Sequence, residues 1–173
     1  MIFTGFKRKT NQIFIKNHIH GFLKKEAEKT QSKVKNILIF VEDDTEISTI
    51  KKELIKQFKI NESQLEIVVY QQKTSKIEAE YPTISPKNFG YYGKLKQEKF
   101  PFNLTKKYDL LINYSKVDSL YLNLLLLQMN ISFRTGYSFF DDRFYNLLVN
   151  CDTTNVAIYT NEIKKYLTIL NKL

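Results

Sequence analysis

The hydrophobic positions of the chain switch between helical spacing and short continuous runs. Residues 3–30 contain no proline, and Ile15, Ile19, Phe22 and Leu23 follow a helical spacing, which predicts a helix. Gly21 lowers helix propensity in the middle of this segment, so two shorter helices are an alternative. Either way, the chain is expected to begin with helical structure.

After this segment, apolar runs alternate with amphipathic stretches. The run "NILIFV" is rich in β-branched residues and predicts a buried strand. A helix at residues 43–58 follows it, with Asp44 or Thr45 as N-cap and Glu46 in the first turn. Because this helix leads to a second strand, the two strands should be parallel with a right-handed crossover. Further strands are predicted at 64–70, 108–114, 132–137 and 145–151, and further helices at 117–129 and 156–173.

The helix at 117–129 is apolar nearly all round, so it should be buried between other layers. Ser115 and Asp118 form a capping-box pattern at its start. The alternation of strands and helices predicts an α/β fold, a three-layer Rossmann-like sandwich with a mainly parallel sheet.

The net charge of +9 is unevenly distributed along the 173 residues. Residues 1–35 carry a net +7, residues 36–81 −3 and residues 82–107 +5, whereas residues 108–173 are neutral. Localised basic segments indicate a polyanionic partner, either nucleic acid or an anionic membrane face. The alternative is a solvated basic surface that only aids solubility.

Size and turn signals indicate one domain. All three prolines lie within residues 71–107, which predicts a long loop there. We therefore expect a basic N-terminal helical arm at residues 1–35 and a single Rossmann-like domain at residues 36–173 that carries this loop. The longest apolar run, "LYLNLLLLQM", is too short to span a bilayer, and a lone cysteine fits a reducing compartment, so a cytoplasmic location is expected.

The acidic segment "VEDDTE" after the first strand resembles that of response-regulator receivers, but Tyr114 stands where their phosphoacceptor aspartate would be. Phosphorelay is therefore rejected. Carboxylates also occupy the place where a nucleotide phosphate would need glycines and backbone N–H groups. A degenerate sugar- or nucleotide-binding enzyme that uses Asp43, Asp44 and Ser115 stays an alternative.

The remaining reactive side chains do not form a catalytic set. His18 and His20 lie two apart on a predicted helix, so they point in different directions and cannot share a metal. Cys151 lacks the glycines of a nucleophile elbow and is interpreted as a buried, inert thiol. We expect a protein that is not an enzyme and that has no metal or cofactor.

Lysines alternate with aromatic residues in "PKNFGYYGKLKQEKFPF". Cations that contact phosphates beside rings that stack on bases are typical of RNA and single-strand binding. The alternative is that the rings pack under the loop and the lysines are solvated. The residues predicted to contact nucleic acid are Lys7, Arg8, Lys9, Lys16, Lys24, Lys25, Lys87, Tyr91, Tyr92, Lys94 and Lys96.

The order "FGYYGK", "YDLLINYS", an apolar helix, "ISFRTGY", "FYNLLVNC" and a final "KKYLTIL" helix is similar to an uncharacterised conserved family of small basic proteins from Bacteroidota. The resemblance covers about four-fifths of the chain, with Asn113 where that family often has aspartate, and it implies a single Rossmann-like domain. A more distant likeness, at Tyr108–Tyr114 and Arg134–Gly136, is to the N-terminal half of heptosyltransferase-type glycosyltransferases. Half of such an enzyme would be a binding module.

The function expected from these features is non-catalytic binding of RNA, with the ribosome as the expected setting. One alternative is attachment to an anionic membrane surface, or to a protein partner, through the N-terminal basic helix. The other is the degenerate sugar- or nucleotide-binding half-domain described above.

Overall fold

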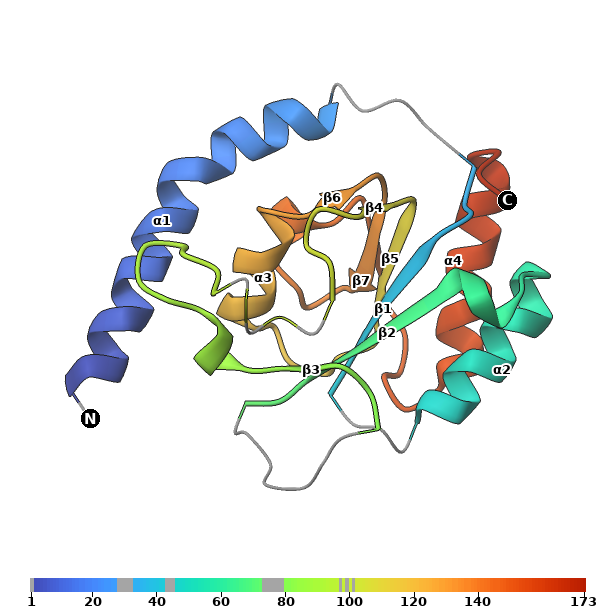
Figure 1. Cartoon of the computed structure of the whole chain (residues 1–173). Helices are drawn as coiled ribbons and strands as arrows, with labels where there is room; N and C mark the ends of the chain where they lie inside the picture. Colours follow the sequence, from blue (N-terminus) through green and yellow to red (C-terminus); the bar gives the residue numbers. More distant parts are fainter. Residues whose placement is uncertain are drawn as a thin grey trace.

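The computed structural model describes residues 2–27, 33–42, 46–72, 80–96, 98, 100 and 102–173 (Figure 1). The helices are α1 (Ile2–Ala27), α2 (Ile47–Phe58), α3 (Leu120–Leu126) and α4 (Val156–Ile169). The strands are β1 (Ile37–Val41), β2 (Leu65–Tyr70), β3 (Thr83–Ile84), β4 (Lys107–Tyr108), β5 (Leu110–Asn113), β6 (Asn130–Ile131), β7 (Arg134–Tyr137) and β8 (Leu147–Val149).

Six strands form one parallel sheet in the order β3-β2-β1-β5-β7-β8. Ile37 of β1 pairs with Leu65 on one side and with Leu110 on the other, so β1 lies in the middle. The chain builds outward from β1 in one direction and then in the other. This is the doubly wound order of Rossmann folds, with the topological switch point between β1 and β5. The predicted Rossmann-like fold with a parallel sheet is confirmed.

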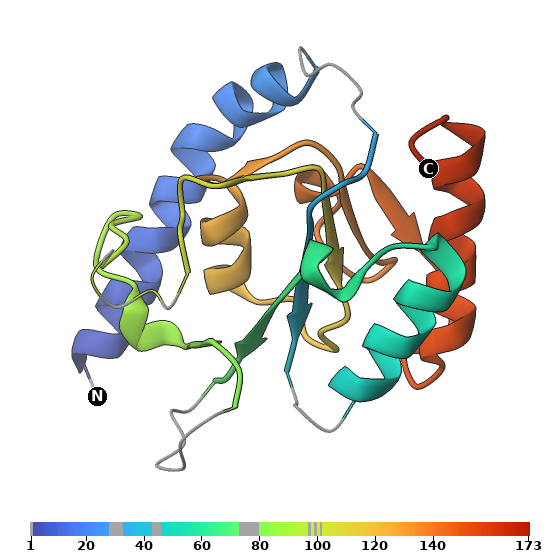
Figure 2. The same cartoon turned by 45° about the vertical axis from the view of Figure 1, so that its right-hand side comes forward.

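Helices cover both faces of the sheet (Figures 1 and 2). On one face α2 and α4 enclose the core that contains Ile39, Leu54 and Ile163. On the other face α1 and α3 enclose a second core that contains Phe22, Phe40 and Leu125. Strands β1 and β5 contribute to both cores because successive side chains of a strand point to opposite faces.

Three details of the helices differ from the sequence-based expectations. First, α1 runs through Gly21 as one helix, so the two-helix alternative is wrong. Second, Glu46 is the N-cap residue of α2 rather than part of its first turn, while Asp44 and Thr45 lie outside the described residues. Third, α3 begins at Leu120 with Ser119 as N-cap residue, so the capping box at Ser115 is wrong.

None of the helices in the described part of the chain is both long enough and apolar enough to cross a membrane.

Candidate nucleic-acid interface

The two basic segments of the sequence pack against each other. The side chain of Asn11 is buried between α1 and the loop at residues 86–96. Its Nδ2 donates to the Gly90 carbonyl at 3.0 Å, and its Oδ1 accepts from the Gly93 N–H at 2.8 Å. Lys7 of α1 donates through Nζ to the Pro86 carbonyl. These bonds join the cations of α1 and those of the loop into one surface.

The loop has a defined local structure. Ser85 caps a short 3₁₀ turn at Pro86–Asn88, and Phe89 then pairs with Leu95 in an antiparallel bridge. Tyr92 and Gly93 at the tip both have positive φ, 50° and 74°, and the Lys94 N–H donates to the Tyr91 carbonyl at 3.1 Å. Two successive positive φ values are those of a type I′ hairpin turn. The turn is tight and presents its tip outward.

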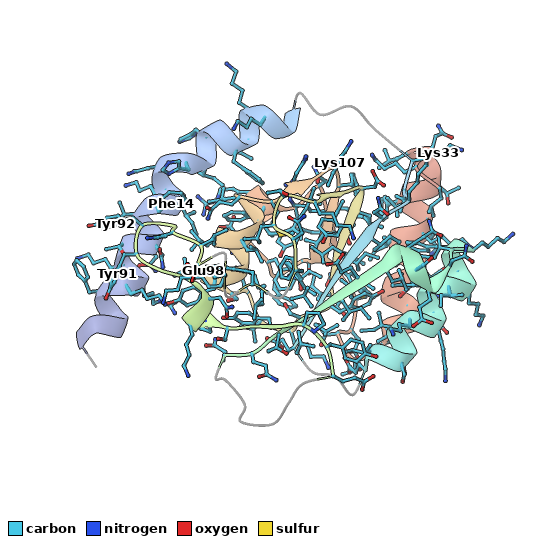
Figure 3. All side chains as sticks on the ribbon, viewed as in Figure 1. Phe14, Lys33, Tyr91, Tyr92, Glu98 and Lys107 are labelled. Atoms are coloured by element: carbon cyan, nitrogen blue, oxygen red, sulfur yellow. The ribbon has the colours of Figure 1, made fainter. Side chains whose placement is uncertain are left out.

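The aromatic residues of the loop divide into buried and exposed rings. Phe89 is fully buried and Phe100 is 9% exposed, so the alternative that rings pack under the loop holds for these two. Tyr91 and Tyr92 are 42% and 57% exposed, beside α1 (Figure 3). The ring of Phe6, itself 56% exposed, lies 5.9 Å from that of Tyr91. The tip therefore offers stacking surfaces to a partner.

Lysines surround a hollow of about 830 Å³ next to this tip. Lys7, Lys94, Lys96 and Tyr91 are among its lining residues, as is Glu98. Burial, and then the nearby Lys96 ammonium, lower the pKa of Lys7. Because a phosphate between like charges would relieve their repulsion, this hollow suits an anion. The Lys7 ammonium also makes a contact within the protein, because it lies 5.5 Å from the centre of the Tyr121 ring.

The other predicted cations of α1 are exposed but do not all face the loop. Lys16 lines a separate hollow with Gln12 and Arg143 on another flank of the helix. Lys25 lies five helical turns beyond Lys7, on the same flank as the loop. Among the cations predicted to contact nucleic acid, those that are exposed are Arg8, Lys9, Lys16, Lys24 and Lys25 of α1 and Lys87 and Lys94 of the loop.

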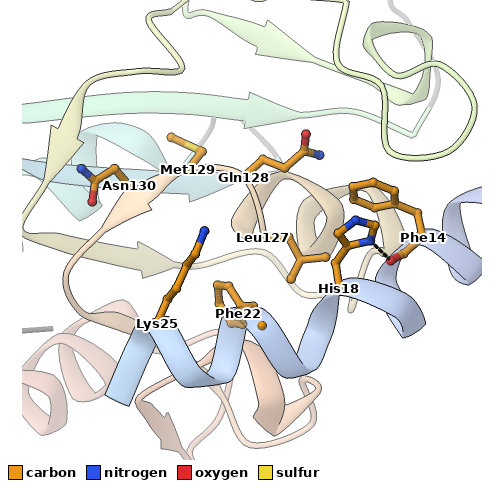
Figure 4. A pocket seen from close by; sticks show the side chains of 9 residues that line it. Phe14, His18, Phe22, Lys25, Leu127, Gln128, Met129 and Asn130 are labelled. Atoms are coloured by element: carbon orange, nitrogen blue, oxygen red, sulfur yellow. Dashed lines mark hydrogen bonds between the residues drawn. The ribbon is translucent and has the colours of Figure 1, made fainter. Parts of the chain in front are cut away.

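A groove that the sequence did not indicate runs between α1 and the end of α3 (Figure 4). It has a volume of about 430 Å³. Phe14, His18 and Lys25 line it on the α1 side, and Gln128 and Asn130 line it on the other side. The row of α1 residues could have been recognised from their spacing, but the opposing wall comes from a segment more than a hundred residues later.

At the carboxyl ends of β1 and β5, where Rossmann folds bind ligands, Lys116 contacts two glutamates. The backbone N–H of Lys116 donates to Glu42 at 3.1 Å, and its Nζ pairs with Glu46 at 2.9 Å. Ser115 is fully buried, while Asp43 and Asp44 lie outside the described residues. Among the described residues of this edge, these contacts give no support to a sugar or nucleotide site.

Cys151 and the His, Cys, Asp and Glu side chains form no reactive set in the described part of the chain. Cys151 is half-buried rather than fully buried, and burial raises the pKa of its thiol, which favours the unreactive protonated form. Within the described ranges, no three His, Cys, Asp or Glu side chains are grouped to hold a metal ion.

A family model described as "Family of unknown function (DUF6913)" matches residues 7–170. The chain belongs to this family. The expectation of an uncharacterised family is thus confirmed, and the DUF6913 match extends from within α1 to the end of α4. No curated protein and no solved structure matches the chain.

Proposed function

We propose that this DUF6913 protein is a non-catalytic RNA-binding protein that uses α1 and the loop at residues 86–96. The observation that carries the proposal is the packing of these two basic segments into one surface through Asn11. Together they hold nine of the 27 Lys and Arg residues. Exposed Tyr91 and Tyr92 lie among these cations, which is the combination that RNA-binding surfaces use for phosphates and unstacked bases.

We extend the proposal to a cytoplasmic protein associated with the ribosome. Ribosomal RNA concentrates unpaired loops and ends in one assembly, and such loops are what phosphate-binding and base-stacking surfaces recognise. The test is affinity purification of the tagged protein from its own cells, with and without nuclease. Ribosomal material that is lost on nuclease treatment is the expected result. Protein or membrane partners that survive the nuclease would contradict the proposal.

Charge reversal at the hollow tests the surface itself. Lys94→Glu with Lys96→Glu should weaken binding to a fluorescent RNA oligonucleotide at least tenfold, because two phosphate contacts become repulsive. The matched control is Lys52→Glu with Lys56→Glu, the same charge change on exposed residues of α2 behind the sheet. Equal weakening in both double variants would mean that only net charge matters, and it would refute the proposed surface.

A second candidate, attachment to an anionic membrane, is favoured by one specific observation. Phe6, Ile13 and Leu23 are 56%, 44% and 41% exposed on α1, so apolar side chains lie there beside lysines that anionic lipid headgroups attract. Flotation with vesicles that contain anionic lipid distinguishes the two candidates. Phe6→Ser with Ile13→Ser should abolish flotation if the membrane is the partner, and flotation should be absent from the start if the partner is RNA.

A further inference from the structure

Four residues of α1 form one row along the helix. Lys7, Phe14, His18 and Lys25 are separated by seven, four and seven positions, each close to a whole number of helical turns. The row is about 27 Å long, from eighteen positions at about 1.5 Å each. It has a cation at each end and two rings between them. This is the flank of α1 on which the loop and the groove lie.

The loop tip contacts both walls of the groove at one end of this row. Phe14 lies directly under Gly93, where a Cβ would clash with its ring. Gln128, on the opposite wall of the groove, donates through Nε2 to the Gly93 carbonyl at 2.9 Å. The hollow lined by Lys7 and Lys94 and the groove that ends at Lys25 therefore lie on either side of the loop tip, along the same flank of α1.

His18 has a defined orientation in the groove. Its Nδ1 lies 2.8 Å from the Phe14 carbonyl oxygen, and because a carbonyl only accepts, Nδ1 must donate. In the neutral ring Nε2 is then an acceptor. One face of the imidazole stacks on Phe14 with ring centres 4.0 Å apart, and the side chain as a whole is exposed. Its other face is therefore accessible from the groove (Figure 4).

We infer that the groove binds one unstacked nucleotide of a single-stranded RNA, with its base on His18 and a phosphate at Lys25. This inference rests on the proposed function and specifies its substrate class. The groove volume of about 430 Å³ is in the range of small-ligand sites, about 300–1,000 Å³. Exposed Asn130 supplies an amide with both a donor and an acceptor for a base edge. A duplex keeps its bases stacked and cannot place one there.

The test compares an unstructured RNA oligonucleotide of about twelve residues with a duplex of the same sequence, by fluorescence anisotropy at one salt concentration. Single-stranded RNA should bind more tightly than the duplex. His18→Ala should weaken single-strand binding about fivefold or more, the usual effect of losing one stacked base, and should change duplex binding less than twofold. Asn130→Ala on the opposite wall should likewise weaken binding of the single strand and not of the duplex. Lys52→Glu on α2 serves as the control.

The inference and the proposed function fail in different ways. If RNA binds and Lys94→Glu weakens it, but both groove variants bind both forms like the wild type, the groove is not used and only the inference is refuted. If Lys25→Glu weakens binding while His18→Ala and Asn130→Ala do not, the contact is purely electrostatic and the inference is also refuted. If no RNA binds at low salt, both are refuted.

Discussion

Asn11 is the residue on which the geometry of the proposed surface depends most directly. Its buried amide satisfies one acceptor and one donor of the loop, so Asn11→Ala leaves the Gly90 carbonyl and the Gly93 N–H without this partner. We expect a loss of about 2 kcal/mol in the free energy of unfolding. Urea titration measures it. Asn17→Ala, at an exposed position of the same helix, should stay within about 0.5 kcal/mol of the wild type.

Gly93 supports the same turn through its backbone. Its φ of 74° disfavours any side chain, and a Cβ would enter the space of the Phe14 ring. Gly93→Ala should therefore lower the free energy of unfolding by about 1–3 kcal/mol. Gly21→Ala should act in the opposite sense and raise it by about 0.5–1 kcal/mol, since Gly21 is mid-helix and no described atom lies within 4 Å of a Cβ there. Effects of the same sign in the two variants would contradict this account.

At the same scale, the sequence indicated the long loop that contains "FGYYGK" but not which of its rings would be buried. Phe89 and Tyr91 are both aromatic and two positions apart. Only the antiparallel bridge to Leu95 and the outward turn at Tyr92 decide that Phe89 enters the core and Tyr91 does not. The side of the loop that is buried also depends on α1, where Asn11 bonds to Gly90 and Gly93 from far away in sequence, so local patterns did not show it.

At the scale of elements, the four helices and the five longer strands were predictable, but their ends and the two-residue strands β3, β4 and β6 were not. The apolar run at 108–114 predicted a strand, and β5 lies within it, because such runs fit a buried parallel strand. The start of α3 was misplaced because Ser115 has a stronger local alternative. Its N–H donates to the Asn113 side chain at 3.0 Å, which holds the chain in a turn before the helix begins.

Helix α1 has two separable roles, because it packs against the second core and also carries exposed lysines of the proposed RNA-binding surface. Removal of residues 1–27 would take Ile15, Ile19 and Phe22 from the second core and uncover α3. We expect the shortened chain to lose cooperative urea unfolding and near-ultraviolet circular dichroism, because each buried side chain contributes about 1.5–3 kcal/mol.

The matching experiment keeps the packing and changes only the surface. Charge reversal at Lys9, Lys16 and Lys24, all exposed, should leave the unfolding transition cooperative. A shortened chain that unfolds as cooperatively as the wild type would instead support a detachable arm, as in the sequence-based division at residue 35. In that case deletion, and not only point substitution, would be a valid test of binding.

At the scale of the molecule, the sequence predicted layers and a parallel sheet but not their arrangement. Alternating elements require crossovers, and right-handed crossovers favour helices on both faces. The direction in which the chain turns after β2, and therefore the burial of α3 under α1, depends on the long-range packing of the second core, to which Phe22 and Leu125 both belong. The hollow at Lys7 and the groove at His18 and Asn130 follow from that arrangement and were not predictable.

The arrangement places the basic segments on one side of the sheet, so binding should depend steeply on salt. For single strands each phosphate contact contributes about −0.7 to the slope of log K against log salt, because counterions are released. With about five contacts the slope should be about −3.5, and Lys94→Ala with Lys96→Ala should make it shallower by about 1.4. Lys52→Ala with Lys56→Ala, on α2, should leave it unchanged. A slope near zero would show that binding releases no counterions and therefore involves no phosphate contacts. A slope that both double variants change equally would show that charge acts without a defined surface, because residues on opposite sides of the sheet would then contribute alike.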